Sequence, residues 1–452
     1  MQSSQTQTIM QADRKTLQTL TLGCSKNRVD TEHILAQAES LYEILPEDWT
    51  GYSDIMLINT CGFIGDAKEE SIQAILEAVE RKKAGDLGRL IVFGCLSQRY
   101  EKEMPELIPE VDAWFGARDF TPLLKEIGVT AVSDFETKRK VTTPGHYAFL
   151  KISEGCDRRC SYCAIPHIRG GHHSVPMEEL VSEAEMLAAK GVRELIVIAQ
   201  DTTYYGLDLY RRRALAELLQ KLSEVDGIEW IRIHYSYPDG FPEDVLDQMA
   251  DNPKVCRYMD IPLQHISDGV LKKMRRNVDG AWTRALIDKM RKRVPGVVLR
   301  TTMIVGHPGE DEAAFGELLD FAREAKFERL GAFTYSEEEG TYGAEHYEDS
   351  VPEEEKARRY DELMTLQGDI SLEFNKSRVG TLEKVIVDSF SDGVFVCRSE
   401  FESPEVDGEI LVGYHPDVLG GLDPYSLVGE FITVRITGAD EYDLSAEIEA
   451  LE

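Results

Sequence analysis

Three cysteines in one short loop constrain this chain more than any other feature. Cys156, Cys160 and Cys163 form the run GCDRRCSYC, a C-x3-C-x2-C pattern that directly follows the apolar segment 148–153. A loop with this spacing can wrap three thiolates around one metal centre. A closed structural zinc site needs four ligands, usually in two separated pairs. An iron-sulfur cluster with one open iron therefore suits the loop better than zinc.

The alternative is that these cysteines are core thiols, because free cysteine is often buried as a small hydrophobic residue. Asp157, Arg158 and Arg159 lie between them. Charged residues at these positions disfavour burial of the whole loop. The pattern therefore favours metal binding.

A second group of three cysteines is spread over the first hundred residues. Cys24, Cys61 and Cys95 are separated by 37 and 34 residues, each interval being about one strand-helix unit, and each follows an expected strand. Parallel strands end at the same edge of a sheet, so the three thiols can meet there. Cysteines that merely pack at strand ends remain the alternative for this group. The adjacent glycines, which would let the backbone approach a bulky group, are Gly23, Gly62 and Gly94.

The 452 residues divide into three segments of different pattern, which together predict an α/β protein. Residues 15–126 alternate apolar runs with helical patterns, as in a parallel βα sheet. Residues 142–372 repeat a strand-helix unit at least six times, which predicts a partial (β/α)6 barrel. Residues 375–446 contain short β-rich runs between glycines and prolines, typical of a small antiparallel barrel.

The expected elements follow from these patterns. A charged helix over 352–374 leads to the last segment, and the acidic loop 336–350 before it is expected to be a mobile surface loop and not a site. Cys256 and Cys397 are expected to be ordinary structural thiols. The predicted strands are 17–22, 54–59, 89–93, 148–153, 194–200, 229–234, 258–262, 297–305, 330–335, 384–388, 394–397, 409–412 and 431–436, and helices are predicted over 67–82 and 176–191.

The chain is strongly acidic. It carries 82 acidic and 50 basic residues, for a net charge of −32. Residues 376–452 alone hold 5 basic and 17 acidic residues, a net charge of −12. Such a surface repels the phosphates of nucleic acid and favours a basic partner, although acidity can also serve solubility alone. We expect a cytoplasmic protein with no membrane segment, because a secretory signal and long apolar runs are missing.

At GCDRRCSYC the chain resembles the radical S-adenosylmethionine (SAM) enzymes. Together with Cys24, Cys61 and Cys95 it is similar to their methylthiotransferase family over nearly its full length. That family has an N-terminal cluster domain, a radical-SAM partial barrel and a C-terminal TRAM domain, in the order of the three segments. Its RimO type modifies an aspartate of ribosomal protein S-twelve, and another branch modifies tRNA adenosine. The strings that resemble the RimO type are CAIPHIRG, AQDTTYYG, DIPLQHIS, LRTTMIVGHPGE and EYDLSAE.

The resemblance implies two 4Fe-4S clusters and SAM as cofactors. Cys156, Cys160 and Cys163 would hold a cluster whose open iron binds SAM, and the N-terminal cysteines would hold a second cluster that carries the sulfur. Cleavage of SAM would give a 5′-deoxyadenosyl radical, which takes a hydrogen from the aspartate β-carbon before the methylthio group is added. The residues expected to line the SAM site are Gln200, Gln264, Arg300, Thr301, Ile304, Gly306 and Gly309.

The implied partners are ribosomal protein S-twelve, on or off the small subunit, and an electron donor such as flavodoxin or ferredoxin. Nucleic acid is not expected as the direct substrate, although the tRNA branch remains the alternative. A non-catalytic iron-sulfur scaffold or electron carrier is a third hypothesis, which the extensive barrel disfavours. Asp201, Tyr204 and His265 are weaker substrate-side candidates, and a structural role would also explain each of them.

Overall fold

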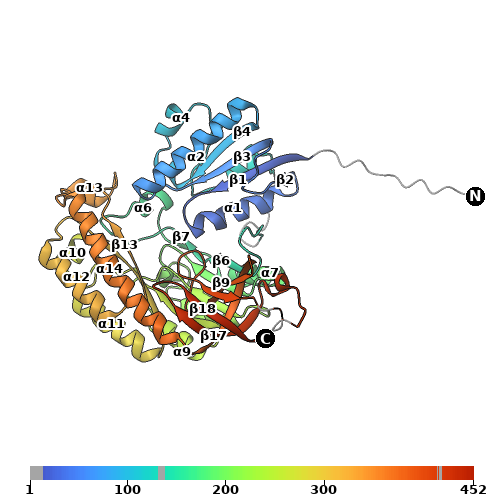
Figure 1. The fold of residues 1–452 in the computed structure, drawn as a ribbon. Coiled ribbons are helices and arrows are strands. Elements are labelled where there is room, and N and C mark those ends of the chain that lie inside the picture. The colour runs from blue at the N-terminus through green and yellow to red at the C-terminus, as the bar shows by residue number, and fades with distance from the viewer. Residues whose placement is uncertain (1–13, 131–137, 415, 417–419, 452) are drawn as a thin grey trace, which may run out of the picture. The chain divides into compact units, whose positions relative to one another are not determined.

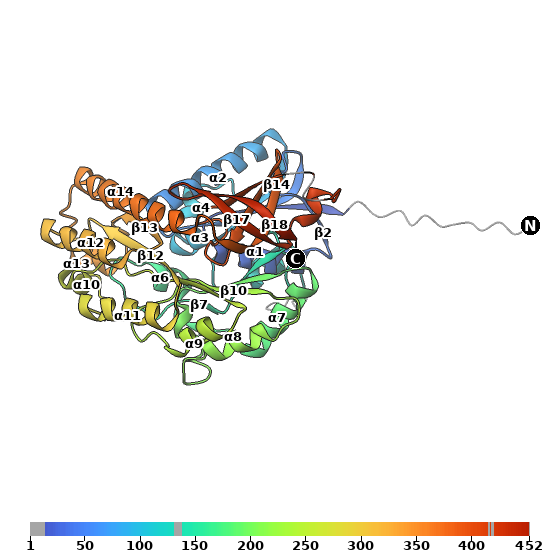
Figure 2. The same ribbon diagram turned by 60° about the horizontal axis from the view of Figure 1, so that its bottom comes forward.

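Figures 1 and 2 show the chain in a computed structural model that describes residues 14–130, 138–414, 416 and 420–451. The chain divides into two compact units, residues 1–140 and residues 141–452. Within the described ranges, no helix combines the length and the apolar character needed to cross a lipid bilayer.

The first unit is a parallel α/β layer structure. In chain order its elements are β1 (Lys15–Thr21), α1 (Ser25–Ala38), β2 (Tyr42–Ile44), β3 (Ser53–Thr60), α2 (Gly65–Ala84), β4 (Leu87–Gly94), α3 (Cys95–Arg99), α4 (Glu103–Leu107), β5 (Ala113–Trp114) and α5 (Thr121–Glu126). The strands form one sheet in the order β2-β1-β3-β4-β5, and every pair is parallel. The predicted parallel sheet is confirmed.

Apolar layers cover both faces of this sheet, as a parallel sheet requires. Leu57 and Ile91 pack toward α1 and α5, whereas Ile58 and Val92 pack toward α2. Helix α2 ends where Gly85 turns into the left-handed region with a φ of 87°, a conformation that glycine adopts at little cost. Helices on both faces leave the carboxyl ends of the strands as the accessible edge.

The second unit begins with a six-stranded sheet. Its elements are β6 (Tyr147–Lys151), β7 (Ser153–Glu154), α6 (Ile165–Arg169), β8 (His173–Ser174), α7 (Met177–Ala189), β9 (Glu194–Ile198), η1 (Thr202–Tyr204), α8 (Leu215–Ser223), β10 (Trp230–Ile233), α9 (Asp244–Asp251), β11 (Val255–Asp260), α10 (Asp268–Lys273), α11 (Gly280–Arg293), β12 (Val298–Val305), α12 (Glu312–Ala325), β13 (Arg329–Thr334), α13 (Tyr342–His346) and α14 (Glu353–Arg378). The six long strands run parallel in the order β13-β12-β11-β10-β9-β6 and do not close. This is the predicted partial barrel.

Successive residues of these strands face opposite sides of the sheet. Leu195, Ile231 and Met259 belong to the large apolar core beneath the surrounding helices. Their neighbours Glu194 and Arg232 form a buried ion pair of 2.8 Å on the other face. The inner face of the open sheet therefore carries buried charged side chains. Such side chains need ion-pair and hydrogen-bond partners, which must come from another part of the unit.

The C-terminal part of the second unit is a small barrel. Its elements are β14 (Leu382–Ser391), β15 (Val394–Ser399), β16 (Ile410–Gly413), η2 (Pro424–Leu427), β17 (Phe431–Ala439) and β18 (Leu444–Leu451). The barrel closes in the order β14-β15-β16-β18-β17. Four pairs are antiparallel as predicted, but β16 and β18 are parallel. Strand β18 was not predicted, because LSAEIEAL has charged residues and alanine and only one β-branched residue.

This small barrel contacts the inner face of the open sheet. The Trp230 and Phe431 rings lie 4.8 Å apart, and Arg398 of β15 approaches Glu194 to 2.8 Å. His234 shares a hydrogen bond of 2.8 Å with Ser403, in the loop after β15. The barrel thus supplies the charged partners that the inner face needs.

Candidate metal centres

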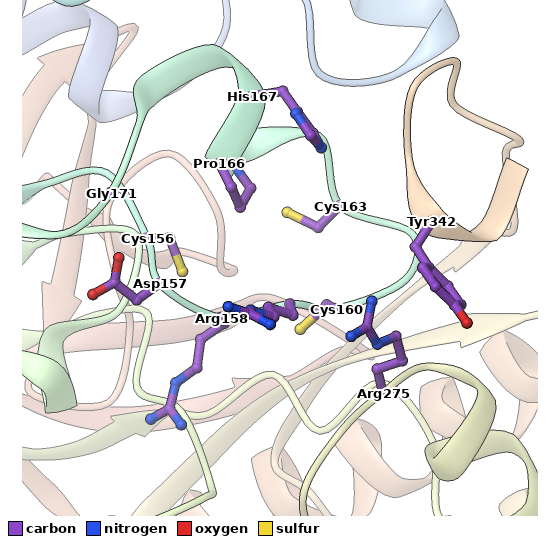
Figure 3. Close-up of a pocket in the computed structure, with 11 residues that line it drawn as sticks. Cys156, Asp157, Arg158, Cys160, Cys163, Pro166, His167, Gly171, Arg275 and Tyr342 are labelled. Carbon is purple, nitrogen blue, oxygen red and sulfur yellow. The ribbon is translucent and has the colours of Figure 1, made fainter. Parts of the chain in front are cut away.

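The loop between β7 and α6 presents three cysteines to one cavity of about 530 Å³. The cavity is lined by Cys156, Asp157, Arg158, Arg159, Cys160, Cys163, Pro166, His167, Gly171, Arg275 and Tyr342. Figure 3 shows the sulfur atoms of Cys156 and Cys163 directed into the space between the two residues, with Arg275 beside Tyr342. The three thiols that the sequence grouped by spacing also share a cavity in space.

Backbone contacts hold this cysteine loop in place. Gly155 has a φ of 73°, and a Cβ on it would lie 2.1 Å from the Gly171 carbonyl oxygen. The Cys156 N–H donates to the Gly170 carbonyl at 3.1 Å. Only glycine allows the first cysteine to come so close to the Gly170–Gly171 turn.

Ser161 fixes the middle of the same loop. Its N–H donates to the Met274 carbonyl at 3.0 Å, and its carbonyl accepts the Gly343 N–H at 2.6 Å. His307 donates from Nδ1 to the Pro308 carbonyl, so its Nε2 accepts the Ser161 hydroxyl at 3.3 Å. Burial lowers the pKa of His307 to about 4, which agrees with this neutral form.

Burial makes the thiolate form of these cysteines costly. Burial raises the pKa of Cys156 to about 12 and raises that of Cys163 well above its usual value. A buried thiolate needs a neighbouring positive charge, and bound iron supplies that charge as it displaces the thiol protons. Thiol donors around a cavity, with Arg158, Arg159 and Arg275 beside them, fit an iron-sulfur cluster.

A site for a single metal ion does not explain these residues. In the part of the chain that the structure describes, no three His, Cys, Asp or Glu side chains are grouped closely enough to hold one ion. An iron-sulfur cube binds each cysteine at a different corner, so its ligands lie farther apart than those of a single zinc ion. The lack of such a grouping among the described residues therefore does not argue against a cluster.

The other three cysteines converge at one edge of the first sheet. They follow β1, β3 and β4, which are neighbours in the sheet, so the expected meeting of their carboxyl ends is confirmed. A Cβ on Gly23 would lie 2.7 Å from the Cys61 Cβ. A Cβ on Gly62 would lie 2.7 Å from the backbone nitrogen of Leu96, the residue after Cys95. The three strand ends are thus in direct contact.

Asn27, in the first turn of α1, links these strand ends. Its side-chain amide donates to the carbonyls of Leu22 at 2.8 Å and Thr60 at 3.1 Å. The Cys95 thiol lies 3.7 Å from its Oδ1 atom. Cys24 is the N-cap residue of α1, one turn before Asn27 and its contacts. This edge therefore also fits a cluster held by three cysteines.

The residues predicted to bind SAM do not line the cysteine cavity. Gln200 donates to Glu154 at 2.6 Å, two residues before Cys156. Gln264 adopts a φ of 73° and pairs with Met303 of β12. Gly306 and Gly309 have positive φ values and make a turn that Glu310 closes by accepting the Gly306 N–H. A role of these residues in SAM binding stays a prediction.

Three other predicted residues are engaged elsewhere. Thr301 is fully buried and donates to the Ile261 carbonyl at 2.9 Å. Arg300 pairs with Asp260 at 2.9 Å and lines a different cavity of about 340 Å³, near Asp407 of the C-terminal segment. Ile304 packs against the apolar cluster that contains Val270 and Met274. The contacts of Thr301 and Arg300 are those of packing residues, and SAM contacts for these three residues also stay a prediction.

The weaker substrate-side candidates have structural partners. His265 is fully buried: its Nδ1 accepts the Ser267 N–H, so its Nε2 donates to Glu310 at 3.0 Å. Asp201 accepts from Arg158 at 2.9 Å. The Arg158 guanidinium lies 5.3 Å from the Tyr204 ring. These contacts support the structural alternative that the sequence left open for all three.

The prediction that the loop 336–350 is not part of a site is wrong. Tyr342 of this loop lines the cysteine cavity, and the Arg275 guanidinium lies 4.2 Å from its ring. Thr341 is buried and caps α13. No local pattern distinguishes this acidic stretch from an exposed loop. Cys256 and Cys397 are buried among apolar side chains, as predicted.

Three known families match successive parts of the chain. They are the uncharacterized protein family UPF0004 at residues 16–116, the Radical SAM superfamily at 150–322 and the TRAM domain at 379–448. Among solved structures, the radical SAM methyltransferase TsrM from Kitasatospora setae is 14% identical with a TM-score of 0.52, over 73% of this chain and 74% of that chain. The cobalamin-dependent radical SAM enzyme OxsB is 13% identical with a TM-score of 0.52, over 79% of this chain and 56% of that one. These likenesses show the fold, which is that of a radical SAM protein.

Curated relatives match over nearly the whole chain. The ribosomal protein uS12 methylthiotransferase RimO of Bacteroides fragilis is 50% identical over 96% of this chain and 99% of its own length. The protein of the same name from Bacteroides thetaiotaomicron is 51% identical over 96% and 98%, and that from Porphyromonas gingivalis 50% over 96% and 99%. The chain belongs to the RimO family of methylthiotransferases. SAM and a 4Fe-4S cluster are the cofactors of its superfamily.

Proposed function

We propose that this protein is a SAM-dependent methylthiotransferase that adds a methylthio group to the β-carbon of an aspartate in ribosomal protein uS12. The observation that carries this proposal is the identity of about 50%, over nearly the full length, with relatives that bear this name. Two separate groups of three cysteines, one in each compact unit, agree with a reaction that needs two metal centres.

The first centre in this proposal is a 4Fe-4S cluster bound by Cys156, Cys160 and Cys163. When bound, it would supply the electron that cleaves SAM. The radical formed from SAM could then take a hydrogen from an unactivated C–H bond. The chain itself holds the three sulfurs around one cavity through the Ser161 and Gly155 contacts. Arg158 and Arg275 line the cavity, so their guanidinium groups would lie beside the bound cluster.

The second centre is a 4Fe-4S cluster bound by Cys24, Cys61 and Cys95, which carries the sulfur for transfer. Its support is the direct contact of the three strand ends and the position of Cys24 at the N-terminus of α1. Gly23 and Gly62 keep the strand ends close, because any side chain there would collide with the neighbouring turn. Separate clusters for SAM cleavage and for sulfur transfer would explain why a second group of three cysteines lies outside the radical-SAM segment.

The remaining assignments follow from this chemistry. An electron donor such as flavodoxin or ferredoxin would reduce the cluster. The proposed reaction on uS12, free or in the small subunit, would take place in the cytoplasm. The three functional segments are residues 15–126 for the second cluster, 142–372 for the radical-SAM core and 375–446 for the TRAM domain. The net charge of −12 over residues 376–452 suits a basic ribosomal protein.

Single cysteine substitutions test the two roles separately. Cys160→Ala should abolish reductive cleavage of SAM, whereas Cys61→Ala should keep that cleavage and lose sulfur insertion. The matched control is Cys256→Ala, which removes a buried thiol of β11 that packs among apolar side chains. The measurements, made without oxygen, are iron content, formation of 5′-deoxyadenosine from SAM under dithionite, and the mass of uS12.

Two results would contradict the proposal. If Cys61→Ala lost all SAM cleavage while its first cluster was intact, the two centres would not have separate roles. If uS12 stayed unmodified while the anticodon-loop adenosine of tRNA gained a methylthio group, the substrate assignment would be wrong. A salt-sensitive complex with tRNA would point the same way.

A further inference from the structure

Tyr237 places its hydroxyl group beside one of the three cysteines of the radical-SAM loop. It lies in the segment between β10 and α9, and its hydroxyl oxygen is 3.5 Å from the Cys160 sulfur. The side chain is 9% exposed. Tyr237 does not belong to the three-cysteine pattern, and no sequence motif connects it with the metal site.

The backbone around Tyr237 is fixed by Asp260 at the end of β11. The Asp260 carboxylate accepts the Tyr235 N–H at 2.8 Å, and the Asp260 carbonyl accepts the Ser236 N–H at 2.9 Å. Tyr235 adopts a φ of 58°, a left-handed conformation that a tyrosine keeps only when its surroundings enforce it. The two residues before Tyr237 are therefore held by a buried strand end, and the hydroxyl is positioned before any cluster binds.

Two arginines hold the Tyr237 ring. The Arg158 guanidinium lies 4.0 Å and the Arg276 guanidinium 4.3 Å from the centre of the ring. Arg158 is anchored by Asp201 and Asp239, each at 2.9 Å. Arg276 donates to the Tyr162 hydroxyl at 3.1 Å and to the Pro262 carbonyl at 2.7 Å. Cations over an aromatic face attract it, so the ring is held while its hydroxyl points to Cys160.

We propose that Tyr237 is a positioning residue that donates a hydrogen bond to the Cys160 sulfur and thereby raises the reduction potential of the cluster. The inference rests on the proposed function, in which Cys160 binds iron. An iron-bound thiolate carries no proton, so the tyrosine hydroxyl must be the donor in this contact. Hydrogen bonds to cluster sulfurs and nearby positive charge stabilise the more negative, reduced cluster. Tyr237 thus makes the cluster easier to reduce.

The test is a potentiometric titration of the reconstituted full-length chain, followed by electron paramagnetic resonance. Both parent and variant carry Cys61→Ala, so that the cluster at Cys156, Cys160 and Cys163 gives the signal. With Tyr237→Phe, we expect the equilibrium constant for reduction to fall about tenfold, which is about 59 mV for a one-electron couple. The matched control is Tyr204→Phe, which removes a hydroxyl from another ring beside Arg158 and should leave the potential unchanged.

The outcomes separate this inference from the proposed function. If the unmutated chain binds no cluster at the three-cysteine loop, the proposed function fails and this inference fails with it. If Tyr237→Phe retains its cluster and has the potential of its parent, the proposed function stands and the role of Tyr237 is wrong. An equal shift in Tyr204→Phe would also overturn it, because the effect would then not come from the hydroxyl at Cys160.

A second measurement keeps the inference testable if Tyr237→Phe does not assemble a cluster. Full-length protein made with 3-fluorotyrosine in place of tyrosine contains more acidic hydroxyl groups, which are stronger donors. Its cluster potential should rise relative to the unlabelled protein, and an unchanged or lower potential would overturn the role of Tyr237. Where Tyr237→Phe does assemble, labelling that variant should leave its potential unchanged, and a rise there would overturn the role as well.

Discussion

Single buried charges hold the C-terminal barrel and the open sheet together. Glu402, in the loop after β15, is 1% exposed and accepts from Arg378 and Arg329, the latter at 2.9 Å. Burial disfavours its charge, but the two arginines and the Ser399 hydroxyl outweigh burial and lower the pKa of Glu402 to about 2. One carboxylate thus accepts hydrogen bonds from residues of α14, β13 and the barrel. Removing one partner from such a buried ion pair strongly destabilises the folded state, because the other charge stays buried without a partner.

Glu402→Gln should destabilise the protein, and the loss should depend on pH. A pKa lowered from 4.5 to about 2 in the folded state corresponds to about 3 kcal/mol of stability. Because the folded pKa is the lower one, this contribution is complete above pH 4.5 and declines as the pH falls toward 2. Urea unfolding should show a difference of about 3 kcal/mol at neutral pH and about half of it near pH 3.

The control for this substitution is Glu362→Gln, which removes an exposed partner of Arg358. Glu362→Gln should change the free energy of unfolding by less than about 1 kcal/mol, because exposed ion pairs contribute no more than that. A difference for Glu402→Gln that is the same at neutral pH and near pH 3 would show that the charge of this carboxylate is not what stabilises the contact.

Gly62→Ala should damage the N-terminal cysteine site. The added Cβ would lie 2.7 Å from the Leu96 backbone, so the Cys61 turn must move away from the Cys95 turn, at a cost of about 1–3 kcal/mol. We expect the iron content to fall by about half, because the proposed cluster at Cys156, Cys160 and Cys163 would lie in the other compact unit. Gly316→Ala in α12, where a Cβ meets open space, is the matched control. If Gly62→Ala kept its full iron content, the close contact between Gly62 and Leu96 would not be needed for cluster binding at the N-terminal cysteines.

At the scale of elements, apolar periodicity predicted the strands and helices whose positions depend on burial of apolar side chains. The long strands β3, β4, β9 and β12, and helix α2, have regular apolar patterns and lie within a few residues of their predicted bounds. The short strands β2 and β5 were not predicted. Strand β18 is also missing from the prediction, because Ile448 is its only β-branched residue, although apolar and polar residues alternate along it.

The sites were predictable only where the residue type itself carries the chemistry. Six cysteines and their spacing indicated both cysteine groups, and parallel topology then brought the N-terminal three together. Arg275, Tyr237 and Tyr342 could not be predicted, because each reaches the cysteine loop through tertiary contacts that leave no local signal. SAM binding by Thr301 stays a prediction, and in the structure its hydroxyl donates to the Ile261 carbonyl.

Helix α13 should support the cysteine loop. A Cβ on Gly343 would lie 2.9 Å from the Ser161 carbonyl oxygen, and this carbonyl accepts the Gly343 N–H. Gly343→Ala should therefore push α13 away and let a chelator remove iron from this cluster several-fold faster. Gly331→Ala in β13, where a Cβ meets open space, is the control. Equal rates of iron loss in the two variants would show that α13 does not stabilise the loop.

At the scale of the whole molecule, we expect the net charge to govern the encounter with the substrate. A net charge of −32 accelerates association with a basic protein and is screened by salt. The association rate with uS12 should therefore fall as ionic strength rises. A C-terminal variant with Glu447→Gln and Glu449→Gln, both exposed on β18, should associate more slowly than the parent when followed by stopped-flow fluorescence.

The matched control carries the same charge change in the other unit, with Glu69→Gln and Glu70→Gln on the exposed surface of α2. Both double variants reduce the net charge equally, so a larger effect at β18 would assign the encounter to the C-terminal barrel. An association rate independent of salt, or equal slowing by both variants, would contradict a specific role of the acidic barrel.

The most direct measurement of the central claim is the mass of uS12 after anaerobic incubation with the reconstituted full-length protein, SAM and dithionite. Two cysteine sites that each bind a cluster predict that one aspartate exchanges a hydrogen for a methylthio group, and that Cys61→Ala and Cys160→Ala each abolish this change. Unmodified uS12, in a reaction where both clusters are present and 5′-deoxyadenosine forms, would contradict the account.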